Sequence, residues 1–164
     1  MKTNKKLIPV FIAAAVIICC ALASRFLVQL AIVDGKSMEP TYRGYQFVFV
    51  SKTGNDFQRG DVIAFRCENA GRLIKRIAAV PGDSIVIRGG RVFVNGEESP
   101  VYRGTQVDFP GAAGNEILLG DNEFFVLGDN LSGSKDSRYE EVGTVARENI
   151  IGKVIPNKIF KASR

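Results

Sequence analysis

The sequence has no histidine, and only 3 of its 164 residues are cysteine. Without histidine, neither a Ser-His-Asp triad nor a Cys-His pair can form, and no metal can have a histidine ligand. Cys19 and Cys20 lie in one apolar segment and Cys67 stands alone after it, so no disulfide is expected within the remaining chain, where Cys67 would be a free or buried thiol. We therefore expect no cofactor and no metal. Any base chemistry falls to another residue type.

The net charge of +5 is unevenly placed. Lys2, Lys5, Lys6 and Arg25 lie in or beside the N-terminal apolar segment, whereas from Asp34 onward there are 18 basic and 17 acidic residues. A nucleic-acid-binding surface needs a basic stripe on the folded domain, so nucleic acid is not an expected partner. The excess positive charge is instead typical of a segment beside a membrane, which makes membrane lipid an expected partner.

An uncharged apolar run extends from Leu7 to Ala23. As a helix it would reach about 25 Å, enough for a thin bilayer. We predict a transmembrane anchor over 7–24, after a cytoplasmic tail over 1–6 and before a membrane-proximal apolar segment over 25–33. The N-terminal lysines favour a cytoplasmic N-terminus and an extracytoplasmic domain. Ala21-Leu22-Ala23 keeps a second interpretation open, a cleavable secretory signal.

Residues 34–164 are predicted to form one mainly β domain. Short apolar runs alternate there with turns rich in Gly, Asp and Asn, and no segment after Val33 has a helical period. Strands are expected at 46–50, 61–65, 73–80, 84–87, 91–94, 117–119 and 123–127, with a hairpin turn at 88–91. The loop-rich stretch 97–115 is a possible small cap or insertion. This pattern alone indicates only a small all-β domain.

Ser37 and Lys75 are the candidates for chemistry in a chain without histidine. A serine hydroxyl is a poor nucleophile until a base takes its proton, and Ser-Lys pairs are a known arrangement. Free lysine has a pKa of about 10.4, but burial can lower this value by several units. In a strand, Lys75 would share a face with Leu73, Ile77 and Ala79, so we expect apolar surroundings. Taken alone, a lysine at such a position more often extends to solvent.

Four groups of short motifs follow the apolar segment in order. They are Ser37-Met38-Glu39-Pro40-Thr41; Arg59-Gly60-Asp61-Val62; Lys75-Arg76-Ile77 with Pro81-Gly82-Asp83; and Gly128-Asp129-Asn130 with Ser134-Lys135-Asp136-Ser137-Arg138. Together they resemble the conserved boxes of the type I signal peptidase (leader peptidase) family, in its short single-anchor bacterial form. The resemblance spans the chain from the anchor to about Val154.

This resemblance implies a fold, an activity and a location. The fold would be a coiled antiparallel β-sheet domain of the signal-peptidase type with one N-terminal transmembrane helix. The activity would be that of a serine endopeptidase, a hydrolase that removes N-terminal signal peptides from exported preproteins by a Ser-Lys dyad. The location would be the bacterial cell membrane, crossed once, with the catalytic domain outside. Two alternatives stay open: a Ser-Lys peptidase dedicated to one preprotein, such as a pilin or conjugation factor, and an inactive membrane-tethered scaffold module.

The resemblance also assigns roles to residues. It implies Ser37 as nucleophile, Lys75 as base, a Ser134 hydroxyl that orients Lys75, and an Asp136–Arg138 ion pair behind the site. Asp129 is a further candidate support. Gly35 stands where some relatives carry a serine that helps to hold the oxyanion, so this role would pass to backbone N–H groups, including that of Ser37.

Substrate recognition follows from the same resemblance. Signal peptides are cut after small residues at the first and third positions before the scissile bond, and the extended peptide would bind between two strands. The positions that line the pockets in relatives correspond to Val33, Met38, Tyr42, Leu73 and Ile74. Plain core packing is an equally open interpretation of each. Arg76, on the opposite face of its strand from Lys75, is expected to reach solvent or an acidic partner.

Overall fold

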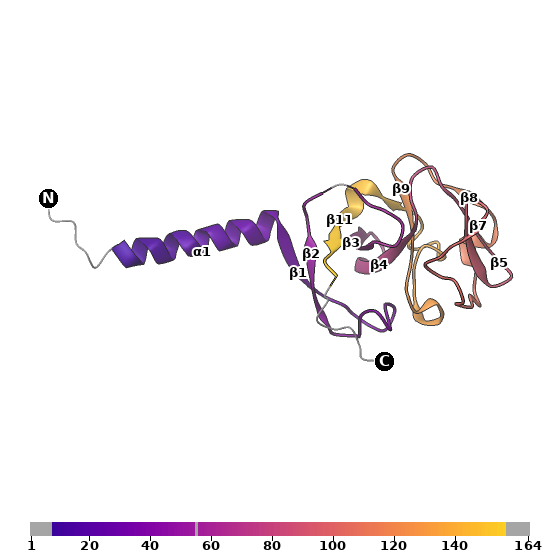
Figure 1. The fold of residues 1–164 in the computed structure, drawn as a ribbon, viewed down its shortest axis with the longest axis horizontal. Helices are drawn as coiled ribbons and strands as arrows, with labels where there is room; N and C mark the ends of the chain where they lie inside the picture. The colour runs from indigo at the N-terminus through magenta and orange to yellow at the C-terminus, as the bar shows by residue number, and fades with distance from the viewer. Residues whose placement is uncertain (1–7, 55, 157–164) are drawn as a thin grey trace.

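The computed structural model describes residues 8–54 and 56–156. A helix of 19 residues, α1 (Ile8–Phe26), projects away from the β-strands that follow it (Figure 1). Among the residues that the structure describes, no helix has the length and apolar character needed to cross a membrane. The helix α1 covers the predicted anchor from Ile8 onward, and its crossing of a membrane stays a prediction. The predicted cytoplasmic tail over 1–6 lies outside the described residues.

The first sheet has seven antiparallel strands in the order β1-β2-β11-β3-β4-β9-β10. They are β1 (Val28–Ile32), β2 (Phe47–Ser51), β3 (Val62–Cys67), β4 (Gly71–Ala79), β9 (Glu123–Leu127), β10 (Val145–Ala146) and β11 (Ile150–Val154). The central strand β3 is almost continuously apolar and buried, as expected for a strand covered on both faces. The more peripheral β2 alternates, with Val48 and Val50 buried and Phe47 and Phe49 exposed.

The second sheet has four strands in the order β7-β6-β5-β8. They are β5 (Ser84–Arg88), β6 (Arg91–Val94), β7 (Glu97–Glu98) and β8 (Ile117–Leu118). The β5–β6 hairpin turns at Gly89 and Gly90, both of which have positive φ, the backbone conformation that a tight hairpin turn requires. The second sheet lies at the end of the β-domain that is far from α1 (Figure 1).

Three buried clusters hold the domain together. The largest packs the second sheet against Phe125 and Leu127 of β9. Another lies beneath β1 and β2 around Met38, and the third surrounds Phe65 and Phe124. Three short 3-10 helices complete the described elements: η1 (Gly111–Gly114), η2 (Leu131–Gly133) and η3 (Arg147–Asn149).

The prediction of a mainly β, antiparallel domain is confirmed. Each predicted strand corresponds to an observed one with small shifts at its ends. The membrane-proximal apolar segment contains an edge strand, β1, and β11 inserts between β2 and β3; neither strand was predicted. The stretch 97–115 begins with β7 and ends beyond η1, and its buried residues Tyr102, Val107 and Ala113 join the largest core cluster.

Candidate active site

Ser37 and Lys75, 38 positions apart in the sequence, meet in the fold. Ser37 lies in the loop between β1 and β2, and Lys75 lies on β4. The Lys75 Nζ donates a hydrogen bond of 2.6 Å to the Ser37 Oγ. The Lys75 side chain is 3% exposed, whereas Ser37 is half-buried. The distance brings Nζ within the reach of Oγ that a neutral amine needs in order to accept the proton of a serine hydroxyl.

The loop that carries Ser37 is held at both ends and from below. Val33 donates its N–H to Gln46 and accepts a bond from Tyr45, so the two ends of the loop are joined. The buried side chain of Met38 anchors the middle in the core. Asn130, in the neighbouring loop, fixes the backbone at Ser37, since its backbone N–H donates to the Ser37 carbonyl at 3.0 Å.

Lys75 has the depressed pKa that a lysine base requires. Burial, which disfavours the charged ammonium, lowers the pKa of Lys75 and is the largest effect. The carboxylates of Asp136 and Asp129 oppose this by raising the pKa, and the Arg138 guanidinium lowers it again. The neighbours of Lys75 on the same strand face are apolar, as expected. Ile77 is a buried member of the cluster around Phe65 and Phe124, and Leu73 packs against that cluster.

Asp136 and Arg138 form the predicted ion pair, and both side chains are almost completely buried. Arg138 Nε donates to Asp136 Oδ1 at 2.7 Å, and its Nη2 donates to Oδ2 at 3.0 Å. Its Nη1 donates to the Phe109 carbonyl, and its Nη2 also donates to the carbonyls of Leu131 and Ser134. Asp136 Oδ2 also accepts the N–H of Gly128 at 3.0 Å. The pair therefore fixes the backbone of the loop that lies against Ser37.

Ser134 lies where this loop is most closely packed. The position of a side chain at Gly128 is already filled by the Ser134 side chain and by the Ser37 carbonyl, so only glycine fits there without displacement. Ser134 is buried, and among the described residues its Oγ has no hydrogen-bond partner. A bond that orients Lys75 is not among those formed in this structure, and the orienting role of Ser134 stays a prediction.

Asp129 pairs with Arg76, the neighbour of Lys75 on β4. Arg76 Nε and Nη2 donate to the two carboxylate oxygens at 2.7 and 2.6 Å. Its Nη1 donates to the Gly60 carbonyl at 2.6 Å, and its Nη2 also reaches Thr41 Oγ1 at 3.3 Å. Arg76 thus has the acidic partner expected of it and ties three loops together around the site. The sequence alone did not identify that partner.

Gly35, two residues before Ser37, is exposed and has a φ of 73°. This left-handed conformation favours glycine, because side chains rarely adopt it. No heavy atom outside its neighbours lies within 4 Å of the position of a Cβ. The backbone here is therefore both conformationally specialised and open to an approaching molecule.

The five residues predicted to line substrate pockets are divided between core and groove. Val33, Met38 and Tyr42 are buried in the cluster beneath β1 and β2. Leu73 and Ile74 are half-buried and line a groove of about 350 Å³ between β4 and the β1–β2 pair. The groove is mostly apolar, and its other side includes Leu30, Ile32 and Phe47.

The groove runs beside an open strand edge. β4 pairs with β3 over residues 71–76 and beyond them with β9 through Arg76, Ile77 and Ala79. In the described ranges, residues 71–75 thus have a partner strand on one side only. The Ile77 N–H donates to the Asp61 carbonyl, on the β3 side of β4. Because the backbone groups of successive residues in a strand point to opposite sides, the N–H and C=O of Ile74 point to the open side. An extended peptide has both a backbone edge and an apolar groove available next to Lys75.

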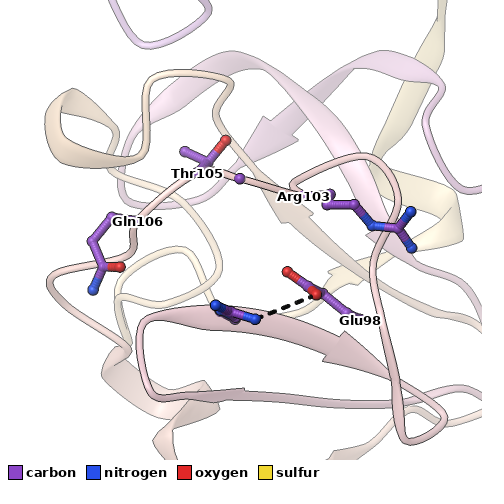
Figure 2. Close-up of a pocket in the computed structure, with 6 residues that line it drawn as sticks. Glu98, Arg103, Thr105 and Gln106 are labelled. Carbon is purple, nitrogen blue, oxygen red and sulfur yellow. Dashed lines mark ion pairs between the residues drawn. The ribbon is translucent and has the colours of Figure 1, made fainter.

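A second hollow, of about 320 Å³, lies on the four-stranded sheet and is lined mainly by polar and charged residues. Figure 2 shows Glu98, Arg103, Thr105 and Gln106 around it, with an ion pair from Glu98 to Arg91 at 3.7 Å. None of the residues predicted for catalysis or substrate binding lines this cavity. The candidate site is therefore the Ser37–Lys75 pair and the groove beside β4.

The chain is similar to known proteins over most of its length. A family model described as signal peptidase, peptidase S26 matches residues 5–156. A signal peptidase I of Bacillus amyloliquefaciens is 31% identical over 92% of this chain and 88% of its own length. A signal peptidase IB of Staphylococcus aureus is 30% identical over the same shares.

One solved structure among the similar proteins is a signal peptidase I from Enterococcus faecalis. It has a TM-score of 0.49 and 26% sequence identity, and the alignment covers 61% of this chain and 97% of that chain. The family match and the relatives at about 30% identity extend across both sheets and every candidate site residue. The predicted resemblance and the prediction of a hydrolase are confirmed, and the chain belongs to the signal peptidase family of serine endopeptidases, peptidase S26.

Proposed function

We propose that this protein removes signal peptides from exported preproteins, with Ser37 as nucleophile and Lys75 as general base. The observation that carries the proposal is the 2.6 Å hydrogen bond between the buried Lys75 Nζ and the Ser37 Oγ. The lowered pKa of Lys75 supports it, because a larger share of the amine is then neutral and able to accept a proton. Membership of the signal peptidase family supplies the substrate class.

The acylation step begins with a proton transfer from Ser37 Oγ to Lys75 Nζ. The oxygen forms a bond to the carbonyl carbon of the scissile peptide, and the carbonyl oxygen becomes an oxyanion. When this intermediate collapses, the C–N bond breaks, and the Lys75 ammonium gives its proton to the leaving amine. The signal peptide is left as an ester on Ser37.

Deacylation repeats these steps with water. Lys75 takes a proton from the water, whose oxygen attacks the ester carbon. The bond to Ser37 Oγ then breaks, and the proton returns from Lys75 to the serine oxygen. The signal peptide leaves with a new carboxylic acid group, which loses its proton to solvent, and the dyad is restored.

The surrounding residues hold this geometry. We assign Asp136 and Arg138 to fixing the loop behind Ser37, and Asp129 to a second brace through Arg76. The buried Ser134 hydroxyl is assigned to the Lys75 ammonium, which has three donors once it is charged. The Ser37 backbone N–H is assigned to the oxyanion. With glycine at position 35, no side-chain hydroxyl is available there, and removal of such a donor in other enzymes costs about 3–4 kcal/mol of barrier.

The substrate is proposed to add as a strand to the open edge of β4. Backbone bonds would give affinity, and the apolar groove lined by Leu73 and Ile74 would select side chains. A charged residue buried in such a groove lacks a partner, and a bulky one clashes with its walls. We therefore expect cleavage of peptides that have alanine at the first and third positions before the scissile bond. Peptides with phenylalanine or lysine at either position should not be cleaved.

Membrane association is proposed through α1 and the outer face of β1 and β2. Leu30 lies opposite Phe49, and Ile32 lies opposite Phe47 in the strand register. All four side chains are more than half exposed, although they are large and apolar. Such a patch beside an apolar helix fits a lipid surface, with the catalytic domain on the extracytoplasmic side. Co-flotation with vesicles tests this contact, and Phe49→Ser should weaken it, since Phe49 is exposed and does not line the groove.

Cleavage assays on the full chain in lipid vesicles, with several unrelated preproteins, test the function. Wild type should cleave most of them, whereas Ser37→Ala and Lys75→Ala should cleave none. Ser132→Ala and Lys135→Ala are matched controls, because both side chains are exposed on the neighbouring loop. Turnover by folded Ser37→Ala would contradict the proposal. Cleavage of a single preprotein would favour the dedicated peptidase, and a folded wild type that cleaves none would favour the scaffold module.

A further inference from the structure

Tyr102 is a buried polar residue to which the mechanism above gives no role. It lies in the loop between β7 and η1, held by turn hydrogen bonds to Ser99 and Thr105. The residue is 5% exposed, and among the described residues its hydroxyl has no hydrogen-bond partner. A buried hydroxyl without a protein partner is costly, and ordered water commonly satisfies such groups.

Tyr102 packs in the largest core cluster with Leu127 and Leu131, the two residues that flank the loop carrying Asp129. Asp129 and Arg76 act on Tyr102 electrostatically, and so do Asp136 and Arg138. Burial, the largest effect, raises the pKa of Tyr102 well above its usual value, so the phenol stays protonated and can donate a hydrogen bond. The Asp129 carboxylate has spare acceptor positions, because Arg76 uses one on each oxygen. A neutral donor beside a buried carboxylate reduces the negative potential that the carboxylate exerts on its other neighbours.

We propose that Tyr102 is a positioning residue of the Ser37–Lys75 site, whose hydroxyl donates through one enclosed water molecule to Asp129 and weakens the charge of that carboxylate at Lys75. This inference rests on the proposed function only for its activity readout. The charged groups that act on Lys75 are Asp136, Asp129 and Arg138, and Tyr42 also lies near the Asp129–Arg76 pair. Of these, Asp129 is the one shared by Lys75, Tyr42 and Tyr102 that raises the pKa of each.

Asp129 raises the pKa of Lys75, and the Tyr102 donor diminishes that influence. Removal of the donor by Tyr102→Phe therefore raises the pKa of Lys75. The rising limb of activity against pH should move to higher pH by a few tenths of a unit, and activity below the limb should fall accordingly.

The test compares Tyr102→Phe with wild type in the full chain. Tyr139→Phe is the matched control, a half-buried tyrosine on another loop that stacks on Phe109. It should leave the limb in place. In an Asp129→Asn background, Tyr102→Phe should produce no further shift, because the carboxylate through which it acts is gone. An unchanged limb in Tyr102→Phe, or an equal shift without Asp129, would overturn the proposal.

Two further measurements need no substrate, so they separate this proposal from the peptidase function. The pH at which the free energy of unfolding begins to rise should move upward in Tyr102→Phe, as Lys75 charges at higher pH in the native state. A crystal structure at high resolution should show a water between Tyr102 Oη and Asp129. A stability profile that does not move, or electron density with no water there, would each count against the network even if cleavage is observed.

Discussion

The Ser37–Lys75 site and the cavity of the four-stranded sheet both contain basic side chains, but these side chains differ in burial and in their partners. Lys75 is 3% exposed, and its hydrogen bond goes to a neutral hydroxyl. Arg91, in the cavity, has a side chain that is 64% exposed and a loose ion pair of 3.7 Å. Water screens the second charge and leaves its chemistry ordinary. Burial destabilises the first, which makes the amine available as a base.

The groups around the two cations differ as well. Around Lys75, Asp136 and Arg138 are buried as a complete pair whose protons and lone pairs reach backbone groups. A buried charge is tolerated when its partners are all present, and loss of one partner leaves the other uncompensated. The cavity of the second sheet has no such enclosed framework among its lining residues. Substitutions in the two regions should therefore differ sharply in effect.

The largest effect is expected from the dyad itself. Ser37→Ala and Lys75→Ala should each reduce the turnover of preprotein by about four orders of magnitude or more, as observed when residues that act as a unit are removed from serine proteases. The double substitution should be hardly worse than either single one. Circular dichroism should show a retained fold. Substantial turnover in pure Lys75→Ala protein would mean that the buried lysine is not the base, and the contrast between the two regions would lose its chemical meaning.

The next effect concerns stability. Asp136→Ala leaves the Arg138 guanidinium buried without its carboxylate and removes the acceptor of the Gly128 N–H. Urea denaturation should show a loss of about 3–5 kcal/mol in the free energy of unfolding. Lys135→Ala, at the exposed neighbouring position, should show almost none. Equal losses in the two variants would mean that the buried pair is no more important than a surface pair.

Gly128→Ala should disturb the site through packing alone. The added Cβ would overlap the Ser134 side chain and the Ser37 carbonyl, so Ser37 must shift. A displacement of about 1 Å in a catalytic group can lower turnover by about 100-fold. Gly114→Ala is the control, since its nearest contact would be an ordinary 3.6 Å to Pro110. Normal kinetics in Gly128→Ala would show that the loop can yield without moving Ser37.

These contrasts also show what the sequence could and could not predict. Alternation of apolar residues placed Lys75 on a buried strand face, and the absence of histidine left lysine as the base to pair with Ser37. The partner of Arg76 depended on the register of β4 against β9 and on the turn that follows β9, features that no local pattern encodes. Tyr102 gave no signal, because its burial depends on the packing of the second sheet against Phe125 and Leu127 of β9.

The N-terminal region illustrates a different limit. A short apolar run has the same composition whether it lies against lipid or pairs as an edge strand. Residues 28–32 form β1, whose register against β2 creates the exposed apolar patch next to the groove. The sequence indicated the apolar character correctly but could not assign the strand, since its partner β2 begins 15 positions after β1 ends.

The pH dependence should show a smaller effect with a definite sign. The native pKa of Lys75 lies below its ordinary value of 10.5, so the unfolded chain binds the proton more readily. The free energy of unfolding should therefore rise with pH between the native pKa and the ordinary value. Below that window the penalty of burying Lys75 is at its full size and constant. Denaturation of wild type and Lys75→Met over a pH series measures the difference, and identical profiles would argue against a depressed pKa.

The smallest effect is expected at Arg91, the exposed cation in the cavity of the second sheet. Its side chain is largely in solvent, and its contact with Glu98 is long. An exposed pair of this kind contributes about 0–1 kcal/mol, and salt screens it further. Arg91→Ala should leave preprotein cleavage unchanged and shift the free energy of unfolding by less than about 0.5 kcal/mol. Arg138→Ala, the same change at a buried guanidinium, provides the contrast. If Arg91→Ala lowered cleavage without lowering stability, the second sheet would take part in substrate binding, and exposure alone would not separate the two regions.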